Sequence, residues 1–141
     1  MACGGASLMP SPPAGRGLVF VGERRSRRAR QLNASWSSGG LAASTLHAAL
    51  RACGIEPSAV LFVNLFQEGD GALVVDPAAL AEVRALASGG ATVVALGRAV
   101  QRRLARNHIS FLPLTHPAAR GRIRTRVIYQ AHVADVLGRA A

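Results

Sequence analysis

The chain has 141 residues, half of them hydrophobic, and a formal net charge of +10 at pH 7. This length predicts one domain, large enough to bury a core without support from disulfides or metal ions. No apolar run approaches the roughly 20 residues that cross a bilayer, and residues 1–17 lack the apolar stretch of a secretion signal. We therefore expect a cytoplasmic protein with a flexible leader over 1–17 and a single domain over 18–141.

Cys3 and Cys53 are the only cysteines, and they form neither a C-x-x-C pair nor a set of four ligands. This argues against a thiolate-bound zinc ion or an iron–sulfur cluster. We expect no cofactor and no metal ion.

All 17 basic residues are arginines. The lack of lysine, together with many alanines, indicates a G+C-rich coding sequence, so part of this bias is genomic. The arginines nevertheless gather in three groups, at 24–30, 102–106 and 120–126. Such patches attract phosphate backbones; the alternative is a set of solvated helix faces in a basic protein.

The first half of the chain predicts two strands with a helix between them. Residues 18–21 form a continuous apolar run, and so do residues 60–63, which end at Asn64. Between them, apolar side chains at i, i+4 and i+7 over 46–53 predict a helix, and Gly54 stands where a helix commonly ends in glycine. His47 on this helix is expected to be exposed.

The second half continues the alternation. Asp76-Pro77 provides an N-cap and a first-turn proline for a helix through Ala87, and residues 92–96 form a third apolar strand. Val100 and Leu104 mark a short helix that Asn107 closes.

A fourth strand over 111–115 contains Pro113, which suits the edge of a sheet. A last amphipathic helix is predicted from Ile123, Val127, Ala131 and Ala134. Continuous apolar strands alternating with helices predict a three-layer α/β/α fold around a mostly parallel four-stranded sheet.

Polar residues and glycines follow each predicted strand: Gly22-Glu23, Asn64, Gly97 and His116. The carboxyl ends of parallel strands meet at one edge of a sheet, where ligands of open α/β folds bind. Neither G-x-x-x-x-G-K nor a G-x-G-x-x-G after the first strand is present, so the sequence lacks the usual motifs of nucleotide kinases and dinucleotide dehydrogenases.

The order of these motifs resembles the uracil-DNA glycosylase superfamily. The resemblance covers 18–137 and rests on Gly22-Glu23 and four further segments: Gly39-Gly40-Leu41-Ala42, Leu61 to Phe66, Val94 to Ala99, and His116-Pro117-Ala118-Ala119. It implies a monomeric DNA glycosylase for DNA repair, which flips a uracil or related base out of single- or double-stranded DNA and hydrolyses its N-glycosidic bond.

The resemblance also assigns roles to residues. His116 would donate to the base oxygen that gains negative charge, Asn64 would read the base edge near Gly22, and Trp36 or Phe66 would stack on the base. Glu23 would orient water. The sequence departs from the family where Arg24 follows Glu23 without the usual proline and where Ala118 replaces a frequent serine.

The arginines that follow the first and fourth strands are expected to contact DNA phosphates: Arg24, Arg25, Arg27, Arg120, Arg122 and Arg124. Two alternatives stay open. One is a non-catalytic member of the same fold that binds nucleic acid or a nucleobase, and the other is an α/β enzyme acting on a small nucleotide.

Overall fold

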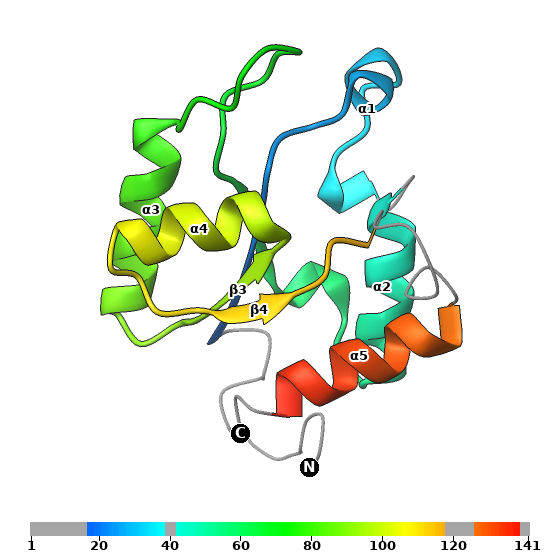
Figure 1. Ribbon diagram of the computed structural model, residues 1–141. Coiled ribbons are helices and arrows are strands. Elements are labelled where there is room, and N and C mark those ends of the chain that lie inside the picture. Colours follow the sequence, from blue (N-terminus) through cyan, green and yellow to red (C-terminus); the bar gives the residue numbers. More distant parts are fainter. Residues whose placement is uncertain (1–16, 39–41, 118–125, 139–141) are drawn as a thin grey trace.

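The computed structural model describes residues 17–38, 42–117 and 126–138. Its centre is a parallel four-stranded sheet in the order β2-β1-β3-β4 (Figure 1). The strands are β1 (Leu18–Gly22), β2 (Leu61–Asn64), β3 (Thr92–Leu96) and β4 (Leu112–Leu114). They match the four predicted apolar runs, and β4, which carries the proline, is an edge strand.

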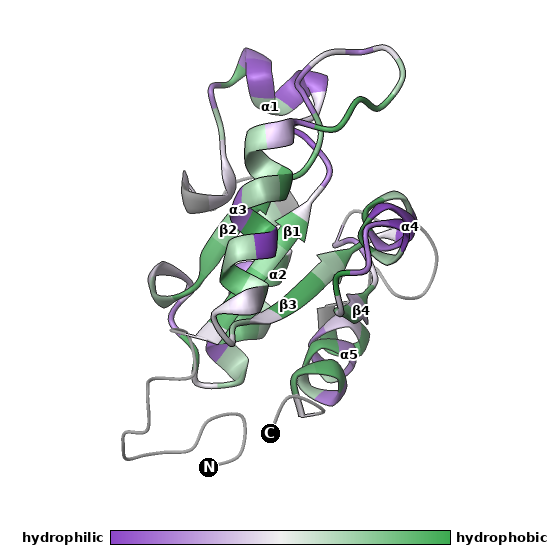
Figure 2. Ribbon diagram, turned by 90° about the vertical axis from the view of Figure 1, so that its left-hand side faces the viewer, coloured by the Kyte–Doolittle hydropathy of each residue, from purple (hydrophilic) through white to green (hydrophobic). Residues whose placement is uncertain are grey.

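Helices cover both faces of this sheet, which confirms the three-layer α/β/α fold (Figures 1 and 2). On one face α2 (Ala42–Ala52) and α5 (Arg126–Gly138) pack on the side chains of Leu18 and Phe20. On the other face α3 (Pro77–Ser88) and α4 (Arg98–Arg106) pack on Val19 and Val21. Successive side chains of β1 thus enter opposite cores, as the pleat of a strand requires.

The predicted helix ends are confirmed. Asp76 caps α3 by accepting a hydrogen bond from the Ala78 amide at 3.0 Å, and Pro77 is the first helical residue. Gly54, after α2, has a φ of +79°, a conformation that glycine adopts without steric cost. Asn107 is the C-cap of α4.

Three short helices were not predicted: α1 (Arg27–Gln31), η2 (Trp36–Ser38) and η3 (Pro57–Ala59). They are too short for an apolar repeat to appear in the sequence. The hydroxyl of Ser26 caps α1 by accepting from the Ala29 amide, and no residue of α1 is buried. A local cap, and not a hydrophobic face, therefore starts this helix.

Two expectations about side-chain burial were wrong. The predicted apolar face of α5 is only partly directed to the core, since Val127 is 73% exposed and Ala131 is exposed, while Ala134 packs against the core. The buried residues are instead Tyr129, Val133, Val136 and Leu137, which present larger side chains to α2. His47 is also buried, at 6% exposure, with its ring 5.8 Å from that of Phe62.

Part of the sequence interpretation lies outside the described residues, namely 1–16 of the predicted leader, Gly39 to Leu41, Ala118, Ala119 and Ile123. In the described ranges, no helix has the length and apolar character needed to span a membrane.

Candidate functional site

The chain reverses its direction of winding at β1. The next strand in the sequence, β2, lies on one side of β1, and β3 lies on the other. In open α/β sheets ligands bind beyond the carboxyl ends of the two strands at such a reversal, here at Gly22 and Gly97, and we call this region the crevice. Of the predicted site residues, Trp36, Asn64 and His116 lie around this point.

Trp36 and Asn64 meet directly over the end of β1. The indole Nε1–H of Trp36 donates to Oδ1 of Asn64 at 3.1 Å. Gly22 pairs in register with Asn64, and a Cβ placed on it would lie 3.0 Å from Asn64 Oδ1 and 3.2 Å from Trp36 Nε1. Any larger residue at position 22 would therefore push these two side chains away by a few tenths of an ångström.

This hydrogen bond sets the orientation of the Asn64 amide. An indole N–H donates and never accepts, so the oxygen of Asn64 must face Trp36. The amide NH₂ of Asn64 is then directed away from Trp36, with two donors, and the oxygen keeps a second lone pair. The side chain can therefore pair with a group that both accepts and donates.

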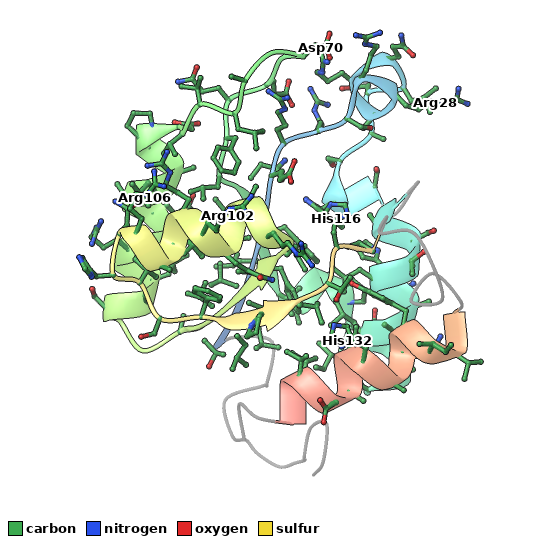
Figure 3. The ribbon with its side chains drawn as sticks, viewed as in Figure 1. Arg28, Asp70, Arg102, Arg106, His116 and His132 are labelled. Atoms are coloured by element: carbon green, nitrogen blue, oxygen red, sulfur yellow. The ribbon has the colours of Figure 1, made fainter. Side chains whose placement is uncertain are left out.

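His116 stands on the other side of the crevice, after β4 (Figure 3). Its ring centroid lies 6.2 Å from that of Trp36, and its Cβ lies 3.6 Å from the point where a Cβ on Gly97 would be. Burial lowers the pKa of His116 below its ordinary value of 6.5, and the Glu23 carboxylate partly opposes this effect. The imidazole is therefore neutral at pH 7 and carries one N–H donor.

Two side chains of α5 hold the residue just before His116. The Thr115 amide donates to Nε2 of His132 at 3.0 Å, and the hydroxyl of Tyr129 donates to the Thr115 carbonyl at 2.8 Å. Burial raises the pKa of Tyr129, which keeps this hydroxyl protonated. Both backbone polar groups of Thr115, its amide N–H and its carbonyl, are therefore hydrogen-bonded to α5, which fixes the backbone next to His116.

Gln101 of α4 ties the same region to the sheet. Its amide nitrogen lies 3.2 Å from the Ala95 carbonyl and 3.3 Å from the Leu114 carbonyl, and so links β3 to β4. Sequence reasoning missed Gln101, Tyr129 and His132 as supports of the site. For Tyr129 and His132 the available signal was a polar group inside an otherwise mostly apolar helix, since a buried polar group needs a partner.

Glu23 is half-buried at the end of β1, and its backbone carbonyl accepts from the Phe66 amide at 2.8 Å. Its negative charge raises the pKa of His116, against the larger lowering effect of burial. Among the described residues no arginine forms an ion pair with Glu23. The neighbouring arginines are directed elsewhere.

The two candidate stacking residues are separated by the sheet. Trp36 stacks on Phe62 with ring centroids 5.4 Å apart, next to the core beneath α2 and α5. Phe66 is buried in the opposite core, beneath α3 and α4. The structure brings Trp36 against Asn64 and His116, and it does not bring Phe66 there.

The arginines at the end of β1 lie against the loop after β2. Arg25 forms a two-point ion pair with Glu68, and Asp70 accepts from both Arg27 and Arg30. Arg24 donates to the carbonyl of Gly71 at 2.7 Å. The pKa of Glu68 is held low mainly by its hydrogen bond to Arg25, and that of Asp70 mainly by its hydrogen bond to Arg27.

The remaining arginines predicted to bind DNA, Arg120, Arg122 and Arg124, lie outside the described residues. Within the described part of the chain, no group of three or more His, Cys, Asp or Glu side chains is arranged to hold a metal ion. A search against protein-family models found no match, and a search of curated proteins found none either.

Proposed function

We propose that the protein is a DNA glycosylase of the uracil-DNA glycosylase type. One observation carries the proposal: Trp36, Asn64 and His116 converge over Gly22 and Gly97 at the point where the sheet reverses its winding. An aromatic plane, an oriented amide and a neutral imidazole are the groups that bind a planar base and stabilise charge on it.

In the proposed reaction a base leaves the duplex stack and enters the crevice. The amide of Asn64 pairs with its Watson–Crick edge, and the ring of Trp36 contacts its face. Water adds to C1′ of the deoxyribose while the N-glycosidic bond breaks, and the bonding electron pair goes to the ring nitrogen of the base. The negative charge spreads to the base oxygen that accepts from the N–H of His116.

Neutral His116 suits this role because its half-buried imidazole carries an N–H donor and its backbone is held by α5. A pre-organised donor acts mainly on charge that develops in the transition state. Glu23 has two roles in the proposal. Its carboxylate offsets positive charge on the sugar, and it orients the attacking water and accepts its proton.

The test is base release from single- and double-stranded oligonucleotides carrying uracil, hypoxanthine or mismatched thymine. We expect alkali-labile product from at least one of them. His116→Ala should lower the rate by ~10²–10³, the usual effect of removing one such donor. DNA affinity should change little, because phosphate contacts supply most of it.

His108→Asn is the matched control, since His108 is exposed in the turn after α4 and asparagine tolerates its φ of +58°. Equal losses in the two variants would contradict the role of His116. A wild-type protein that binds DNA and releases no base would refute the enzyme and support the non-catalytic binding protein.

A further inference from the structure

The surface of α4 carries four arginines in nine residues. Arg98, Arg102 and Arg106 are exposed at i, i+4 and i+8, so they form one row along the helix, and Arg103 is half-buried beside them. Figure 2 shows α4 as one of the most hydrophilic elements, and Figure 3 marks Arg102 and Arg106 on it. We call Arg98, Arg102 and Arg106 the α4 row.

No carboxylate side chain of the protein neutralises the α4 row. The sequence has seven Asp and Glu residues, and all seven lie in the described ranges. Every ion pair among the described residues is made by arginines of other elements. Among the described residues the α4 row therefore has no ion-pair partner, and a bound polyanion can supply its counter-charges.

The α4 row also has a definite position relative to the crevice. The helix begins directly after Gly97, which lies beside His116. From Arg98 to Arg106 the helix rises ~12 Å, which equals the axial rise of about three to four nucleotides in one strand of a duplex. The α4 row thus leads away from the candidate site over a length that suits a short run of phosphates.

We infer that the α4 row is a track for the phosphate backbone of DNA, and that the strand next to the flipped base runs along α4. The choice of DNA as the polyanion rests on the proposed function. The row itself does not, because it follows from the charge balance and the geometry of the helix.

A membrane surface fits α4 less well. Helices that lie in a lipid interface expose an apolar face to it. The two large apolar residues of α4, Val100 and Leu104, are fully buried against the sheet, and none of the large exposed hydrophobic residues belongs to this helix. What α4 offers to a partner is charge and hydrogen-bond donors alone.

The experiment measures the affinity of the full chain for an oligonucleotide of normal bases over a range of salt concentrations. Arg102→Gln with Arg106→Gln removes two charges and keeps good helix formers. We expect the affinity to fall on the order of tenfold at low salt. The slope of log affinity against log salt should become shallower by about 1.4 for single strands or 1.8 for duplex.

Arg28→Gln with Arg84→Gln is the matched control, because it removes the same charge from exposed helical positions on α1 and α3 that form no ion pair among the described residues. Circular dichroism verifies that both variants are folded. Equal losses in the two double variants would show that only net charge matters and would overturn the inference. Binding to phosphatidylserine vesicles without binding to DNA would overturn it as well.

These outcomes are separable from the fate of the proposed function. If the α4 variant loses DNA binding and the wild type releases no base, the inference that the α4 row binds DNA phosphates is supported and the glycosylase proposal is refuted. If the wild type releases base and the α4 variant binds DNA normally, the track fails and the glycosylase proposal stands.

Discussion

The arginines around α1 and those of α4 differ mainly in what surrounds them. Around α1, Glu68 and Asp70 pair with three of the five arginines, and a carbonyl binds a fourth. On α4, within the described ranges, no arginine forms an ion pair. The first group joins one loop of the protein to another, while the charge of the second is not paired within the described structure. A net charge of +10 therefore says less about partners than the position of seven carboxylates does.

The largest effect on this difference is expected when the carboxylates that pair with the arginines around α1 are removed. Glu68→Gln with Asp70→Asn should release Arg25, Arg27 and Arg30. We expect the affinity for DNA to rise about tenfold and the salt slope to steepen by up to about 2.1 for single strands or 2.7 for duplex, because three more cations can displace counterions.

Glu56→Gln with Glu82→Gln is the control for this gain, since it removes the same charge at exposed positions on other elements. Salt titrations of both double variants are the measurement. If both double variants gain the same affinity for DNA, the ion pairs with Glu68 and Asp70 do not limit DNA binding by the arginines around α1.

The buried histidines and the carboxylates that pair with the arginines around α1 should affect stability at different pH. Burial lowers the pKa of His116, and it lowers that of His47 with help from Arg51. The folded state then binds fewer protons than the unfolded chain. This contribution to the free energy of unfolding is complete above the ordinary value of 6.5 and is lost as pH falls below it.

Glu68 and Asp70 act in the same direction at lower pH. Their ordinary pKa values are 4.5 and 3.8, and both are lowered in the folded protein. Urea unfolding at a series of pH values should therefore give a loss of stability in two stages. His47→Gln with His116→Gln should flatten the upper stage only; an unchanged slope between pH 7 and 5 in that variant would refute the assignment.

The smallest effect is expected from Arg25→Gln. The ion pair with Glu68 is solvent-exposed, and such pairs add little to stability. Thermal unfolding should show a decrease in Tm within about 2 °C. A much larger decrease would mean that the loop after β2 depends on this pair for its fold.

Much of the fold was predictable because its signals are local. Four apolar runs became the four strands, and Asp76-Pro77 and Gly54 marked helix ends where the structure has them. The strand ends also located the candidate site, since parallel strands bring Asn64 and Gly22 to one edge. These features depend on the spacing and chemistry of neighbouring residues.

The rest depends on contacts between distant residues. Nothing near His132 in the sequence indicates that its ring accepts from the amide of Thr115. The buried face of α5 is chosen by its packing on α2, and the burial of His47 by its packing near Phe62. The pairing of Arg25 with Glu68 spans a loop that no periodic pattern predicts.

The position of β1 in the sheet has a consequence for how the chain folds. It is the first of the four strands to be synthesised, yet it lies between β2 and β3, and all five of its residues are buried. Both of its neighbours come much later in the chain, and such non-local parallel pairings form slowly. Until they form, an apolar strand has two open edges that invite pairing with other chains. Refolding is therefore expected to be slow, and its yield is expected to fall as the protein concentration rises.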